Sequence, residues 1–312
     1  MSSMKLAFNA VFPLLAFMVV GAGLRRAGML DDKTSAGLNK LVFKVFLPLS
    51  IFQSIYNTDI GSAFDLKVAL YVAVSCVISF LVISLIAAHR EPDPTVRPVV
   101  VQGTHKANYN LLAIPIVSSF YGSSIGMTAV LIIVITPIVN ICSTIAFESA
   151  RGGSASLPKM IKKIALNPLV LSSLIGFAVN MSGLRFPQIV MSGVVSKLSA
   201  MATPAAMLIL GADFSADSVR RWAKQLAAVC AGKLIILPLV LVTGAVLFGI
   251  RGADLIAVLI YSGSPAAVNS YSTAVSMGGN AELAGEIVAV TSLLSVFTLF
   301  VFLTVMGGMG LI

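Results

Sequence analysis

Charged side chains are scarce in this chain of 312 residues. Asp, Glu, Lys and Arg make up 11% of it, whereas soluble domains carry about 25%. With 58% apolar residues and a mean hydropathy of +0.99, the chain cannot cover a soluble surface with charge. The composition excludes an ordinary cytosolic enzyme, a disordered chain and a secreted disulfide scaffold. It indicates an all-α integral membrane protein of several helices.

Reactive and metal-binding side chains are also few. Cys76, Cys142 and Cys230 lie inside apolar runs without Cys-x-x-Cys spacing, which is typical of small buried residues. A membrane enzyme needs paired acids, a nucleophile with its base, or a metal cluster. The two His and the loop or span-end Asp residues supply none of these. We therefore predict that the chain is not an enzyme and binds no metal or organic cofactor, and the lack of a GxxxxGK[ST] motif argues against ATP drive.

Ten stretches are long and apolar enough to cross a bilayer, which takes about 20 residues each. The predicted spans are residues 6–23, 37–56, 68–88, 98–121, 125–147, 164–181, 187–212, 222–249, 255–277 and 283–306. Residues 107–147 carry no charge, so the turn between spans 4 and 5 must be Tyr121-Gly122-Ser123-Ser124.

The net charge of +9 is spread between hydrophobic stretches and does not indicate nucleic-acid binding. Lys5, Lys67, Arg185 and Arg251 lie on one predicted side of the membrane. Twelve basic residues lie on the other: Arg25, Arg26, Lys33, Arg90, Arg97, Arg151, Lys159, Lys162, Lys163, Arg220, Arg221 and Lys224. The positive-inside rule puts the twelve in the cytoplasm. This predicts a multi-pass protein of the cytoplasmic membrane with both termini outside.

The longest predicted loop, residues 148–163, is a basic cytoplasmic linker with a Gly-Gly-Ser-Ala-Ser stretch. It divides the chain into five-helix repeats at residues 1–147 and 164–312, and an odd number of spans inverts the second repeat. Pro13 and Pro168, Pro48 and Pro204, and Tyr121 and Gly278 pair at offsets of 155 to 157 residues. The shared offset favours a true inverted repeat.

Spans 4 and 9 are interrupted at comparable places in the two halves. Span 4 carries the polar run 102–110 and then Pro115, and span 9 has a Gly and Pro break at Ser264-Pro265 with Asn269 beyond it. A broken helix exposes N–H groups and a partial positive charge at the start of its second half. Paired breaks of this kind indicate a transport site, and helix N-termini suit an anion such as a carboxylate.

Cations outnumber acids inside the spans, which also favours an anionic cargo. We predict a substrate cradle of Asn108, Asn110, Pro115, Pro265 and Asn269 with Lys106 beside it. Lys197 and Lys233 fit better as ties to backbone carbonyls of neighbouring helices, and Lys40 and Lys44 as snorkelling side chains. Coupling to H⁺ or Na⁺ stays open. Its candidate residues are His105, Ser264, Ser270, Thr273 and Glu286.

Four segments together resemble the auxin efflux carrier family, whose bacterial members transport small organic acids and whose fold is shared with bile acid–sodium symporters. They are residues 102–122, Asn167-Pro168-Leu169-Val170, residues 204–211 and residues 264–271. The family usually has an Arg and a Gly around the span 4 Asn, whereas this chain has His105-Lys106 and Asn110. This departure leaves the choice of substrate open.

The resemblance implies a scaffold of spans 1, 2, 6 and 7, often dimeric, and a moving transport domain of spans 3–5 and 8–10. Spans 4 and 9 would cross at the substrate. The function predicted is a secondary carrier for a small organic anion, a mono- or dicarboxylate, working by an elevator mechanism. The partners predicted are this anion, the lipid bilayer and a second copy of the chain, without nucleic acid. An anion channel or a non-transporting membrane sensor remains the alternative.

Overall fold

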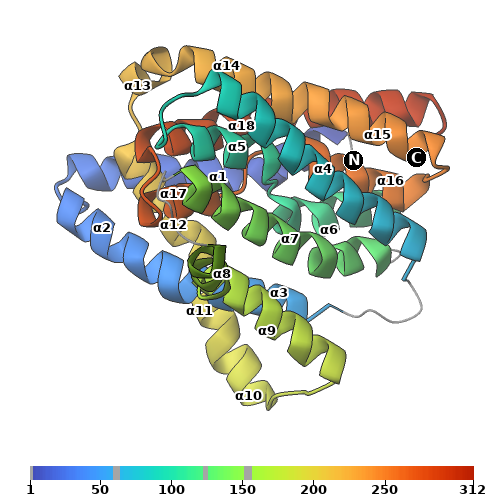
Figure 1. Ribbon diagram of the computed structural model, residues 1–312, viewed down its shortest axis with the longest axis horizontal. Helices are drawn as coiled ribbons and strands as arrows, with labels where there is room; N and C mark the ends of the chain where they lie inside the picture. The colour runs from blue at the N-terminus through green and yellow to red at the C-terminus, as the bar shows by residue number, and fades with distance from the viewer. Residues whose placement is uncertain (1–2, 59–63, 122–125, 151–156) are drawn as a thin grey trace.

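The computed structural model describes residues 3–58, 64–121, 126–150 and 157–312. This part of the chain is helical (Figure 1). The first half contains α1 (Ser3–Arg26), α2 (Asp32–Leu41), the π-helical η1 (Val42–Phe46), α3 (Leu47–Tyr56), α4 (Leu66–Arg90), α5 (Arg97–His105), α6 (Tyr109–Tyr121) and α7 (Gly126–Ala150). The second half begins with α8 (Leu157–Ala165), α9 (Pro168–Ser182), α10 (Gln188–Val190), η2 (Met191–Val195), α11 (Ser196–Ala200) and α12 (Ala202–Asp213). It ends with α13 (Ala216–Arg221), α14 (Ala223–Ala231), η3 (Gly232–Ile236), α15 (Leu237–Leu247), α16 (Gly252–Gly263), α17 (Asn269–Ser276) and α18 (Ala281–Gly308).

Helices occupy the positions of all ten predicted spans within the described residues. Six are long and apolar enough to cross a membrane by themselves: Asp32–Tyr56, Leu66–Arg90, Met127–Ala150, Gln188–Asp213, Ala223–Leu247 and Ala281–Gly308. Tyr109–Tyr121, Pro168–Ser182 and Gly252–Gly263 are shorter apolar helices. The chain is thus a multi-pass, all-helical membrane protein, and the count of ten spans stays a prediction.

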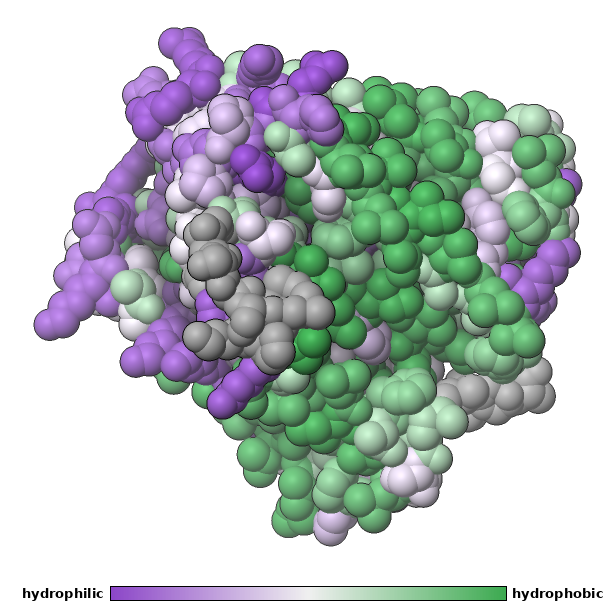
Figure 2. All heavy atoms as spheres, viewed as in Figure 1, coloured by the Kyte–Doolittle hydropathy of each residue, from purple (hydrophilic) through white to green (hydrophobic). Residues whose placement is uncertain are grey.

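The polarity of the surface changes along the bundle axis. Figure 2 shows a broad hydrophobic band between a large hydrophilic end, where α2 and α13 begin, and a smaller hydrophilic area at the opposite end. Large apolar side chains such as Val19, Leu85 and Ile236 are exposed at the surface of the bundle. Exposed apolar side chains of this density suit contact with lipid tails.

The linker is partly helical. The predicted flexible stretch at residues 152–156 and most of the predicted turn after Tyr121 lie outside the described residues. Residues 148–150 of the linker end α7, and residues 157–163 lie in α8, where Lys162 and Lys163 follow the exposed Ile161. Lys163 Nζ is 2.8 Å from Glu148 Oε2 at the end of α7.

Glycines allow two distant helices to touch. A Cβ placed on Gly21 of α1 would lie 2.0 Å from the carbonyl oxygen of Leu208 on α12, and one on Gly211 of α12 would lie 2.0 Å from that of Met18 on α1. Small residues let backbones approach closely in membrane helices. The first helix of the chain, α1, is thereby packed against α12 of the second half.

The core surrounds the interrupted helices. Leu255, Ile256 and Leu259 of α16 are fully buried, and Leu112 and Val117 of α6 pack into the same core. A helix that is apolar on every side belongs in the middle of a bundle. The neighbours α7 and α18 contact α16 and enclose it. The breaks in these helices therefore lie inside the protein.

Candidate functional site

Two helices are interrupted at the centre of the bundle. The first break separates α5, which ends at His105, from α6, which begins at Tyr109. The second separates α16, which ends at Gly263, from α17, which begins at Asn269. The break predicted at Ser264-Pro265 is confirmed. In span 4 the break lies before the predicted Pro115, which stands inside α6.

The two breaks are joined by backbone hydrogen bonds. The Asn108 N–H donates to the Pro265 carbonyl at 2.9 Å, and the Ala267 N–H donates to the Lys106 carbonyl at 3.1 Å. Ala107 and Ala266 thus form an antiparallel bridge. Each break supplies partners for backbone groups that the other leaves without a helical partner. The interrupted helices therefore form one crossing, and α6 and α17 both start from it.

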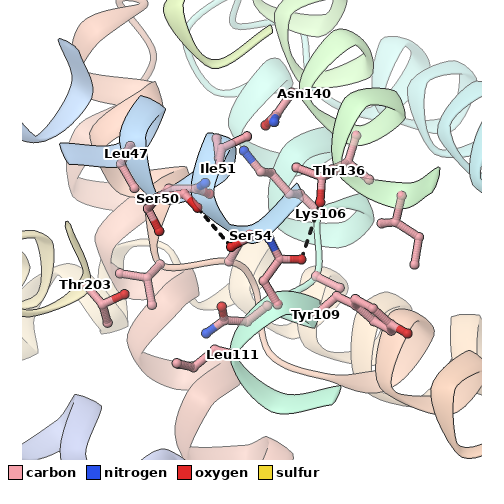
Figure 3. A pocket seen from close by; sticks show the side chains of 18 residues that line it. Leu47, Ser50, Ile51, Ser54, Lys106, Tyr109, Leu111, Thr136, Asn140 and Thr203 are labelled. Carbon is pink, nitrogen blue, oxygen red and sulfur yellow. Dashed lines mark hydrogen bonds between the residues drawn. The ribbon is translucent and has the colours of Figure 1, made fainter. Parts of the chain in front are cut away.

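A cavity of about 170 Å³ lies beside this crossing. Its lining residues come from the crossing and from the helices α3, α7 and α12. The residues are Leu47, Ser50, Ile51, Ser54, Lys106, Ala107, Asn108, Tyr109, Asn110, Leu111, Ile135, Thr136, Val139, Asn140, Thr203, Ala267, Val268 and Asn269. Figure 3 shows the polar ends of several of these side chains around the space. An engineered apolar cavity of about 150 Å³ holds a benzene molecule, so this cavity suits a ligand of similar size.

Lys106 is the one charged side chain among the residues that line the cavity. It is 3% exposed, and its Nζ has no hydrogen-bond partner among the described residues. A buried ammonium group without a partner costs several kcal/mol. The N-termini of α6 and α17 add partial positive charge at the crossing. The crossing therefore places a buried Lys side chain and two helix N-termini beside one cavity.

Three predicted asparagines line the same cavity. Asn108 and Asn269 flank the crossing, and one amide atom of each, Nδ2 of Asn108 and Oδ1 of Asn269, has no partner among the described residues. Asn110 follows on α6, where its Oδ1 accepts a hydrogen bond from Thr136 Oγ1 at 3.4 Å. Each side-chain amide carries both a hydrogen-bond donor and an acceptor.

The two predicted prolines lie elsewhere. Pro115 is an exposed residue of α6 outside the cavity lining. Pro265 acts through its backbone carbonyl, which accepts from Asn108. Its ring does not line the cavity either. Neither proline side chain thus lines this cavity, and the Pro265 carbonyl lies at the crossing beside it.

The candidates for ion coupling do not gather at one place. Nε2 of His105 is 2.9 Å from the Cys76 carbonyl oxygen, and the ring contacts Phe80, away from the cavity. Glu286 accepts from Ser218 Oγ at 2.8 Å near the start of α13. Ser264, Ser270 and Thr273 are buried around the second break. No group of three or more His, Cys, Asp or Glu suited to a metal occurs in the described ranges.

The other lysines considered in the sequence analysis differ in their burial. Lys233 is fully buried, and its Nζ donates to the Tyr261 carbonyl at 3.4 Å, which confirms the predicted tie between helices. Lys197 is exposed and forms no hydrogen bond to a neighbouring helix among the described residues, so the same prediction was wrong for Lys197. Lys44 is exposed as well. Lys106 thus differs from all three by being both buried and without a partner.

Sequence reasoning missed the far wall of the cavity. Ser50 and Ser54 come from α3, Thr136 and Asn140 from α7, and Thr203 from α12. Polar residues within otherwise apolar spans are the signal that could have identified them, because such residues face the bundle interior. Thr136 and Asn140 are four apart, so they share one face of α7.

Comparison with known proteins decides the family. A family model described as membrane transport protein matches residues 6–158 and 150–303. The chain belongs to the auxin efflux carrier family. An uncharacterized transporter of Methanothermobacter thermautotrophicus is 22% identical over 295 residues, which cover 93% of this chain and 95% of that protein. Membership of this family makes the chain a membrane transport protein and favours transport over catalysis.

Proposed function

We propose that this protein is a secondary carrier for a small organic anion, a mono- or dicarboxylate. The observation that carries the proposal is Lys106, whose buried Nζ has no hydrogen-bond partner among the described residues and whose cavity has no acid among its described lining residues. The N-termini of α6 and α17 at the same crossing add to the positive potential. A carboxylate bound there would neutralise Lys106 and accept hydrogen bonds from the amides.

The carrier works by an elevator motion in this proposal. The cavity lies between the crossing and the helices α3 and α12, which belong to the predicted scaffold. Within that scaffold α1 packs on α12 and α3 packs on α9. In the predicted repeat, span 1 corresponds to span 6 and span 2 to span 7. The contact between spans 1 and 7 therefore corresponds to the contact between spans 6 and 2. This agreement supports both the repeat and the division into two domains.

Substrate counterflow in proteoliposomes tests the carrier proposal. Vesicles preloaded with a small carboxylate should accelerate uptake of the labelled acid, because a carrier returns faster when it is loaded. A channel gives no such stimulation. Carboxylates that neither bind nor exchange would overturn the proposal.

The variant Lys106→Gln tests whether the anion binds at this cavity. It keeps a polar side chain but removes the charge, so counterflow should fall at least about tenfold. Lys44→Gln is the matched control, since Lys44 is exposed and does not line the cavity. Equal activity of both variants would place the anion elsewhere.

A further inference from the structure

An apolar groove of about 280 Å³ lies at the surface where α1, α12 and α18 meet, apart from the crossing. None of the described residues that line it has a polar side chain. Its floor is made of buried residues, among them Met18, Gly211 and Ala289. Its rim is made of exposed apolar side chains, among them Val19, Phe214 and Leu293. Small residues on the floor between large ones on the rim therefore leave the groove open to the outside of the bundle.

The groove matches the depth of one leaflet of a bilayer. Four of its lining residues, Leu15, Met18, Val19 and Ala22, recur every three or four positions along α1 and lie within the predicted first span, residues 6–23. The helix rises about 10 Å from the first to the last of them. One leaflet supplies about half of a hydrocarbon core that is about 30 Å thick. The groove therefore runs through most of one leaflet and ends close to the point where α1 leaves the membrane.

A cation follows the groove on the same face of α1. Arg26 comes four residues after Ala22, and residues four apart lie on one side of a helix. Arg26 is exposed and forms no hydrogen bond or ion pair among the described residues. The neighbouring Arg25 is engaged by the chain itself, because its guanidinium donates to the Leu30 carbonyl at 2.9 Å and pairs with Asp32. Of the two arginines, Arg26 is thus the one available to an anion at the end of the groove.

We propose that the apolar groove binds one anionic phospholipid, whose acyl chain lies between α1, α12 and α18 and whose phosphate binds Arg26. A guanidinium forms charge-assisted hydrogen bonds with phosphate oxygens, and the acyl chain gains packing contacts in the groove. The predicted orientation places Arg26 at the cytoplasmic leaflet, which carries anionic lipids. The headgroup therefore determines which lipid binds, and the groove holds its chain. This inference does not depend on the proposed carrier function.

The charge at the end of the groove argues against a second copy of the chain as its occupant. Two copies related by a two-fold axis along the membrane normal keep the same end on the same side of the membrane. A contact of the two grooves would then place both Arg26 side chains beside one another, where like charges repel. A lipid phosphate meets the same guanidinium with the opposite charge.

The test titrates the delipidated protein in detergent with two lipids that have the same chains. Dioleoylphosphatidylglycerol is anionic, and dioleoylphosphatidylcholine has no net charge. A bound lipid raises the midpoint of thermal unfolding by mass action. The anionic lipid should half-saturate this rise at a concentration about fivefold lower, the ratio expected for one Arg close to an anionic headgroup. Glycerol 1-phosphate, which has no chains, should give no rise, and a rise with it alone would show a site for free phosphate and overturn the lipid proposal.

Two variants separate the headgroup from the chain. Arg26→Gln should weaken the binding of phosphatidylglycerol about fivefold and leave that of phosphatidylcholine unchanged. Its matched control is Arg90→Gln, since Arg90 is exposed at the end of α4 and does not line the groove. Ala22→Phe fills the groove and should weaken the binding of both lipids. Its matched control is Ala228→Phe, since Ala228 is exposed on α14 outside the lining.

A cross-linking measurement on the unaltered protein locates the chain even if a variant fails to fold. Phosphatidylglycerol with a photoactivatable diazirine in its acyl chain should label peptides of α1, α12 and α18, as mapped by mass spectrometry. Equal labelling of α4, whose Leu81 and Leu85 are exposed, would show only general contact with lipid and overturn the proposal. Equal affinity for the two lipids, or equal effects of Arg26→Gln and Arg90→Gln, would overturn it too. If Ala22→Phe separates a dimer and leaves lipid binding unchanged, the groove is an interface between copies instead.

Discussion

The backbone N–H of Asn108 donates to the carbonyl oxygen of Pro265 at 2.9 Å, and this bond joins the two interrupted helices. The Asn108 side chain takes no part in it. One of its amide atoms, Nδ2, lacks a partner among the described residues and is free to donate to a ligand. Structural and binding roles at this position can therefore be separated by substitution.

Asn108→Ala and Asn269→Ala should each lower the apparent affinity for carboxylate roughly 10- to 100-fold. A hydrogen bond to a charged group contributes about 1.5–3 kcal/mol, and about 1.4 kcal/mol corresponds to a factor of ten. The half-saturation concentration in counterflow measures the effect. Folding should survive, because the backbone bonds of the crossing remain.

Pro115→Ala is the control for these variants. Pro115 lies on α6 but not in the cavity lining, so its replacement should leave affinity unchanged. Asparagine variants with normal affinity would show that the crossing is only structural.

The fold was largely accessible from the sequence. Long apolar runs and their charged ends predict where helices occur, because lipid requires every backbone group to be satisfied within a helix. The expectation that a helix is interrupted at proline also located the second break at Pro265. It misplaced the first break, since Lys106, Ala107 and Asn108 contain no residue that disrupts a helix. That break is stabilised by hydrogen bonds to the other half of the chain, which local sequence does not encode.

The site was accessible only in part. Lys106, Asn108, Asn110 and Asn269 lie in the polar segments of spans 4 and 9, and the structure brings all four to one cavity. Asn140 lies in the apolar α7 and reaches the cavity through tertiary packing. Sequence patterns describe one helix at a time, so they do not show which faces of α3, α7 and α12 meet.

The contact between α1 and α12 gives a stability prediction. Gly21→Ala or Gly211→Ala would place a methyl group against a backbone carbonyl of the partner helix. Helices must then separate, at a cost of about 1–3 kcal/mol for an overpacked site. A lower midpoint of thermal unfolding in detergent measures this loss.

Gly23→Ala is the matched control on the same helix, because nothing lies within 4 Å of its added Cβ. It should leave the midpoint unchanged or raise it slightly, since Ala favours the helix. If all three variants had the same midpoint of thermal unfolding, close packing at Gly21 and Gly211 would not stabilise the protein.

The elevator proposal predicts that a bond between the two domains stops transport. Asn39 of α2 donates to Ser276 Oγ of α17 at 3.4 Å, and these helices belong to the predicted scaffold and transport domain respectively. Oxidation of the double variant Asn39→Cys, Ser276→Cys should abolish counterflow. Carboxylate binding in a thermal-shift assay should persist, and reduction should restore transport.

Gln53→Cys with Ser199→Cys is the control pair. These residues are hydrogen-bonded between α3 and α11, both within the predicted scaffold. Cross-linking them should leave counterflow intact. Continued transport by the oxidised Asn39–Ser276 pair would instead favour a fixed site with no relative motion of these helices.

The orientation of the chain is tested by labelling two exposed loop positions on intact cells. Pro94 lies between α4 and α5 near the basic residues Arg90 and Arg97, and Leu184 lies between α9 and α10. In a variant without native cysteines, Leu184→Cys should react with a membrane-impermeant maleimide from outside. Pro94→Cys should react only after the cells are permeabilised, because positively charged loops stay in the cytoplasm. The reverse labelling pattern would put both termini in the cytoplasm and invert the assignment of every loop.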